Sequence, residues 1–66
     1  MKRDKLKGLM VAQRKSYAYM AGVAGMSTTS FSNKMQGRTQ FDVAEATLIA
    51  NDLKLSLADR CDIFLS

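Results

Sequence analysis

Apolar residues recur along this chain at helical spacing, and capping residues or glycines separate the successive runs. The first run, which contains Leu6 and Met10, predicts a helix over about Asp4–Arg14. Ser16 and Gly25 bracket the second run, the first as an N-cap and the second as a C-terminal stop. A second short helix is therefore expected between them.

The third run is more polar than the first two, because Phe31 and Met35 are its only apolar residues. Ser27 is a suitable N-cap and Gly37 a suitable stop, so the pattern predicts a helix over Thr28–Gln36. Its remaining positions carry hydroxyl or amide groups and a single lysine. A merely solvated helix would normally be richer in Glu and Lys.

Two capping patterns predict the last two helices. Asp42 and Glu45 form the D-x-x-E pattern of a capping box before a fourth helix, whose apolar side is Ala46, Ile49, Ala50 and Leu53. Ser56 with Asp59 makes a similar start for a fifth helix, whose apolar side is expected to be Leu57, Cys61, Phe64 and Leu65. No strand pattern competes, so the expected fold is all-α with five short helices.

Length and composition limit the kinds of function and site that the chain can have. With 66 residues there is room for one domain, and a partner or dimerisation is an expected source of extra stability. The chain has no histidine, one cysteine and no phosphate-binding glycine loop, so we expect no enzymatic activity, no cofactor and no metal. Cys61 lies in an apolar helical pattern and is expected to be a small buried hydrophobe. The longest uncharged stretch, residues 16–33, is too polar for a membrane span or signal peptide, which predicts a soluble cytoplasmic protein.

Charge is unevenly distributed along the sequence. Residues 1–38 carry eight basic residues against one acidic residue, or +7, whereas residues 39–66 carry two against five, or −3. This asymmetry suggests that the N-terminal half faces a polyanion. The alternative is that these are ordinary solvated side chains.

The segment SYAYMAGVAGMSTTSFSNKMQG, residues 16–37, resembles the helix-turn-helix of phage Cro and repressor proteins. The matching positions are a helical alanine, the turn glycine, an apolar turn residue, the serine cap and an apolar anchor, which are Ala21, Gly25, Met26, Ser27 and Phe31. The flanking segments KLKGLM and FDVAEATLIANDLKLS are also similar. The resemblance therefore covers nearly the whole chain, residues 1–66, and implies one lambda-repressor-like domain.

Two departures from the family pattern lie in the second helix. Tyr17 stands where the family most often has a glutamine that contacts a DNA phosphate. Gly22, Val23 and Ala24 are small residues where longer or charged side chains are usual, so this helix is expected to be intrinsically weak.

The resemblance implies roles for particular residues on double-stranded DNA. Contacts with base edges are implied for Thr28, Thr29, Ser32 and Asn33. An asparagine can pair with adenine through two hydrogen bonds, and a threonine methyl can touch the methyl group of thymine. Contacts with phosphates, which set affinity and register, are implied for Arg14, Lys15, Tyr17, Ser27, Ser30, Lys34, Gln36, Arg38 and Thr39.

Two functions remain as alternatives. The first is a Cro-type transcriptional repressor of a phage or prophage, which binds an operator in the bacterial cytoplasm, alone or in a switch with a second phage regulator. The second is a small antirepressor or interaction module that keeps the fold and binds another regulator. Apolar residues of the C-terminal half either form a homodimer interface or simply close the core; they are Leu57, Ile63, Phe64 and Leu65.

Overall fold

A computed structural model of the chain describes residues 1–65, and within them it has five α-helices and no strand. The helices are α1 (Arg3–Ala12), α2 (Tyr17–Ala24), α3 (Thr28–Met35), α4 (Val43–Asp52) and α5 (Leu57–Phe64). The predicted all-α fold is thus confirmed, and the helix ends lie within two residues of those predicted. Each helix in this range is too short or too polar to cross a lipid bilayer.

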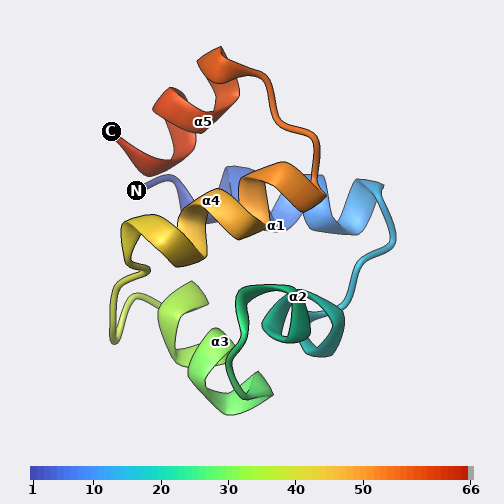
Figure 1. The fold of residues 1–66 in the computed structure, drawn as a ribbon, viewed down its shortest axis with the longest axis vertical. Helices are drawn as coiled ribbons and strands as arrows, with labels where there is room; N and C mark the ends of the chain where they lie inside the picture. Colours follow the sequence, from blue (N-terminus) through green and yellow to red (C-terminus); the bar gives the residue numbers. More distant parts are fainter. Residues whose placement is uncertain (66) are drawn as a thin grey trace.

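Figure 1 shows α2 and α3 together at one end of the molecule, α1 and α4 across its middle, and α5 at the opposite end. α2 packs against both α3 and α4, and α1 packs against α5. All five helices contribute to one core, which consists of Leu6, Met10, Met20, Ala21, Ala24, Phe31, Met35, Ile49, Ala50, Leu53, Leu55 and Ile63. The end formed by α2 and α3 is therefore supported from within by the rest of the domain.

The capping residues predicted for four helices are confirmed. The hydroxyl oxygens of Ser16, Ser27 and Ser56 each accept a hydrogen bond of 3.1 Å from the backbone N–H three residues later. At the start of α4, Asp42 and Glu45 form the complete capping box, in which each side chain accepts from the other residue's N–H. Each cap satisfies donors that a helix start otherwise leaves without partners.

The helices α1 to α4 all end in the same way, with one residue in the left-handed region of backbone space. Two of these residues are Gly25 and Gly37, with φ of 74° and 83°. The other two are Arg14 and Lys54, with φ of 57° and 55°. In each case the next N–H donates across the turn to a carbonyl five residues back, at 2.9–3.0 Å. A Schellman motif thus ends each helix, and at two of the four ends it strains a residue that has a Cβ atom.

The apolar side predicted for the fifth helix was wrong. Ile63 is fully buried, whereas Leu57 and Leu65 are 78% and 80% exposed, Cys61 is exposed and Phe64 is only partly buried. The expected burial of Cys61 is therefore corrected. The apolar spacing misled because α5 is oriented by its acidic side, which lies against α1 together with Ile63.

Ion pairs hold this acidic side of α5 against α1. Lys2 Nζ lies 2.5 Å from Asp62, and Lys5 Nζ lies 2.7 Å from Asp62 and 3.2 Å from Asp59. Hydrogen bonds from Lys2 and then Lys5 lower the pKa of Asp62 to about 2. The backbone N–H of Lys2 also donates to the Ile63 carbonyl at 2.8 Å. Exposed ion pairs add little stability, so the burial of Ile63 contributes more to the orientation of α5, and the ion pairs favour the same orientation.

We predict that Lys54→Gly stabilises the protein by about 0.5–1 kcal/mol. The substitution relieves the left-handed strain at the end of α4, and the greater freedom of glycine in the unfolded chain offsets part of that gain. Urea denaturation measures the difference. Lys54→Ala is the matched control, because it removes the side chain and keeps the Cβ atom; an equal gain from alanine would show that strain is not the cause.

Candidate nucleic-acid interface

A short turn connects α2 to α3 and sets the two helices against each other. Gly25 ends α2 with a positive φ, Met26 is partly buried against the core, and Ser27 caps α3. The predicted helix-turn-helix segment, residues 16–37, thus contains two packed helices joined by three residues. This is the local architecture that can present its second helix to a partner.

The aromatic ring of Phe31 holds α3 in place. It is fully buried between two other rings, with centroid distances of 5.3 Å to Tyr17 and 5.6 Å to Phe41, both in edge-to-face geometry. Met35, one turn later, is 6% exposed. Because these are the only apolar residues of α3, their burial turns the polar side of the helix outward. Tyr17, expected to contact phosphate, uses its ring for this packing and is only partly exposed.

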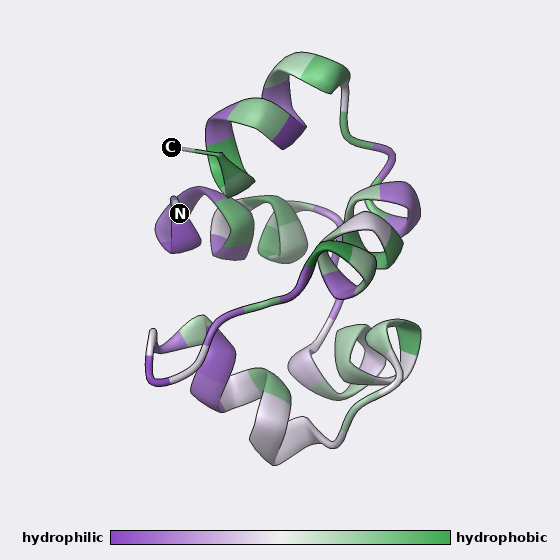
Figure 2. Cartoon of the chain, turned by 60° about the vertical axis from the view of Figure 1, so that its left-hand side comes forward, coloured by the Kyte–Doolittle hydropathy of each residue, from purple (hydrophilic) through white to green (hydrophobic). Residues whose placement is uncertain are grey.

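The residues expected to contact bases lie along one strip of α3. Thr28 and Thr29 are exposed at its N-terminal end, and Ser32 and Asn33 follow them one turn later, partly buried. Figure 2 shows the N-terminal part of α3 in the pale colours of weakly polar residues, at the end of the molecule away from α5. We call these four residues the α3 strip. It is uncharged and carries hydroxyl, methyl and amide groups.

Hydrogen bonds along the helix order the C-terminal half of the α3 strip. Gln36 Nε2 donates to Ser32 Oγ at 3.2 Å, and Arg38 Nη1 makes a long contact of 3.5 Å with Asn33 Oδ1. Among the residues expected to contact phosphate, Ser27 uses its hydroxyl oxygen as the cap and Ser30 is partly buried. Gln36, Arg38 and Thr39 are exposed where α3 ends.

Two of the lysines expected to contact phosphate are engaged within the protein. Lys34 Nζ donates to the Gln40 carbonyl at 2.9 Å and lies 3.5 Å from Glu45 Oε1, and its side chain is 18% exposed. Lys15 Nζ donates to the backbone carbonyl of Asp52 at 2.9 Å and to its carboxylate at 2.7 Å. Both lysines therefore tie the helix-turn-helix segment to α4.

Arg14 and Arg38 are the expected phosphate contacts that remain available as cations. Both are exposed, and neither forms an ion pair with any residue in the described part of the chain. Arg14 lies in the turn before α2, and Arg38 follows α3. The interface therefore has far less free positive charge than the sequence asymmetry suggests.

Two features near the interface were missed from the sequence. Arg3 Nε donates to the Lys34 carbonyl at 3.1 Å, so α1 caps the C-terminal end of α3. Tyr19 Oη donates to Asp52 Oδ1 at 2.8 Å, and this bond raises the pKa of the Tyr19 hydroxyl. The hydrogen bond from Lys15 lowers the pKa of the Asp52 carboxyl. Pairs separated by more than thirty residues have no spacing signal that would have revealed them.

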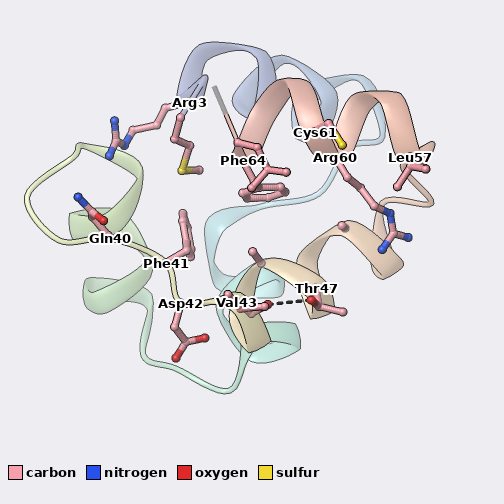
Figure 3. Close-up of a pocket in the computed structure, with 14 residues that line it drawn as sticks. Arg3, Gln40, Phe41, Asp42, Val43, Thr47, Leu57, Arg60, Cys61 and Phe64 are labelled. Carbon is pink, nitrogen blue, oxygen red and sulfur yellow. Dashed lines mark hydrogen bonds between the residues drawn. The ribbon is translucent and has the colours of Figure 1, made fainter.

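A second candidate surface lies between α4 and α5. Figure 3 shows an open groove there, with a volume of about 400 Å³, whose floor includes Phe41 and Phe64. Its margin carries side chains of both signs, because Asp42 lies toward one end and Arg60 toward the other. Cys61 and the exposed Leu57 also line it. We call this surface the α4–α5 groove.

Comparisons of the chain with protein-family models, with curated proteins and with solved structures gave no match.

We predict that Phe31→Ala destabilises the domain by about 3–5 kcal/mol, because it deletes a fully buried ring that packs against two others. In so small a domain this loss unfolds most of the molecules, which circular dichroism with urea titration detects. Thr28→Ala on the same helix is the control and should change stability by less than about 0.5 kcal/mol. A comparable loss in the control would mean that the α3 strip is needed for folding.

Proposed function

We propose that this chain is a sequence-specific DNA-binding transcriptional regulator of the Cro repressor type, without catalytic activity, which places α3 in the major groove of an operator. The observation that carries the proposal is the α3 strip: an uncharged row of hydrogen-bonding groups on a helix whose apolar residues are all buried. Such groups pack poorly in a core but can donate to and accept from base edges.

Shape supports the same proposal. The major groove of B-DNA is about 12 Å wide and accepts one α-helix, whose diameter with side chains is about 10–12 Å. α3 lies at the end of the molecule opposite α5, so the C-terminal helix does not cover it (Figure 1). The N-terminal residues of such a helix approach the bases, and here these are the exposed Thr28 and Thr29.

Phosphate contacts are expected on both sides of α3. Gln36, Arg38 and Thr39 would meet the backbone where α3 ends, and Arg14 would do so near the start of α2. Because Lys15 and Lys34 are engaged with α4 and its preceding loop, we assign these two lysines to holding the helix-turn-helix segment in place. Few free cations imply that affinity depends only moderately on salt.

We predict that Arg38→Ala weakens binding to the selected operator and to random duplex by the same factor. It should also flatten the plot of log affinity against log salt by about 0.9, the slope for one phosphate. Fluorescence anisotropy with a labelled duplex measures both quantities. Duplex binding that does not depend on salt, or no binding at all, contradicts the proposed function.

Lys34→Ala is the matched control for that experiment. Its ammonium group already has the Gln40 carbonyl and Glu45 as partners, so the salt slope should stay close to that of the unmodified protein. If this variant flattens the slope as much as Arg38→Ala, then Lys34 leaves its partners and contacts phosphate.

We further propose that a second copy of the chain occupies the α4–α5 groove. One surface supplies both the hollow and the protruding side chains, Leu57 and Leu65, as a twofold contact between identical surfaces requires. A dimer of this kind would present two α3 helices to two half-sites.

We predict that the chain sediments as a dimer and that Leu57→Lys makes it monomeric without unfolding it, because the leucine is 78% exposed. Leu48→Lys is the control: Leu48 is also exposed, lies on α4 and does not line the groove. Cys61, the only thiol of the chain, gives a second measure, since a short bismaleimide should join two copies through it. A monomer at all concentrations would contradict the dimer.

The same groove supports the alternative function, a module that binds another regulator. An apolar groove with exposed leucines suits a protein partner as well as a second copy. The two functions require different surfaces: DNA binding requires the α3 strip, and binding of another regulator requires the α4–α5 groove. The alternative requires that no duplex binds and that substitutions in the α3 strip leave the activity of the protein unchanged.

A further inference from the structure

We infer that the half-site contacted by the α3 strip consists of A·T base pairs, recognised through thymine methyl groups and adenine edges, with no cation in the strip itself to select guanine. This inference rests on the proposed DNA binding and specifies its substrate. The inference follows from two sets of side chains: those that are exposed on α3, and those that are engaged with other parts of the protein.

The available groups favour A·T pairs. Thr28 and Thr29 are exposed at the N-terminal end of α3, and each presents a methyl group beside its hydroxyl. The methyl can contact the thymine C5 methyl, which no other base of unmodified DNA carries in the major groove. Asn33 adds an amide, whose carbonyl can accept from adenine N6 while its NH2 donates to adenine N7.

None of the four residues of the α3 strip is an arginine or a lysine. Guanine is most often recognised by an arginine or lysine that bonds to O6 and N7. Lys34 is the only cation within α3, and it is turned away to the Gln40 carbonyl and to Glu45. Arg38 lies beyond the end of α3, and its Nη1 lies 3.5 Å from Asn33 Oδ1; we assign its guanidinium to the phosphate backbone.

The other half of a G·C pair also lacks a selective partner. Cytosine is recognised by carboxylates, which accept from its N4 amino group, and α3 contains neither Asp nor Glu. The hydroxyl groups of the α3 strip can form hydrogen bonds with A·T and with G·C pairs alike. The contact between Arg38 Nη1 and Asn33 Oδ1 is long, at 3.5 Å, and occupies at most one lone pair of that oxygen. It leaves the amide NH2 group and one carbonyl lone pair of Asn33 available for adenine.

The test begins with selection of bound sites from a random duplex library by the full chain. The selected half-sites should carry A·T pairs at the positions that become unspecific in Asn33→Ala and Thr29→Ala. The selected duplex is then prepared with uracil in place of the half-site thymines, which removes only the methyl groups. Affinity should fall about fourfold for each methyl that is contacted. Uracil in place of thymines outside the half-site is the control and should have no effect.

A protein variant checks the same contact from the other side. Thr29→Ser keeps the hydroxyl and removes the methyl, so the difference in affinity between thymine and uracil duplexes should shrink. Selected half-sites with G·C pairs, or equal affinity for thymine and uracil duplexes, would overturn the inference while leaving DNA binding established. If no duplex binds with salt dependence, the proposed function and this inference both fail.

Discussion

Phe31 is fully buried, and its packing sets how three segments of the chain are arranged. Its ring meets those of Tyr17 and Phe41, so the start of α2, the middle of α3 and the segment before α4 are joined at one point. An isolated helix of eight residues is unstable in water, and α3 therefore depends on this packing and on the Ser27 cap. Because only Met35 accompanies Phe31 as an apolar residue, the same contact that stabilises α3 also fixes which side of it faces outward.

Electrostatic contacts have a different role in this fold. Four of the eight basic residues in the N-terminal half pair with acidic residues of the C-terminal half; they are Lys2, Lys5, Lys15 and Lys34. Half of the basic residues behind the charge asymmetry thus serve attraction between two parts of one molecule. The outer side of α3 is left nearly neutral, with Arg14 and Arg38 as the exposed arginines that flank the helix-turn-helix segment. Recognition by such a surface depends more on hydrogen bonds and shape than on charge.

The sequence predicted the local features well, because capping residues, glycine stops and the two apolar residues of α3 act over three or four positions. The sequence prediction failed for α5, where the apolar spacing was compatible with two orientations of the same helix. In α5 both the face of Cys61 and the face of Ile63 have helical spacing, and contacts with α1 decide between them. The predicted site residues were similarly incomplete: their exposure on α3 followed from composition, whereas the engagement of Lys15 and Lys34 depends on partners distant in the sequence.

We propose that the outer side of α3 is the surface that meets DNA. Backbone amide NMR spectra of the 15N-labelled chain, recorded during titration with a selected duplex, report which residues the duplex contacts. We expect the largest shifts or line broadening on residues 28–33 and on Arg38, with small changes in α5 apart from its groove residues. Shifts concentrated in the α4–α5 groove, with residues 28–33 unchanged, would contradict it.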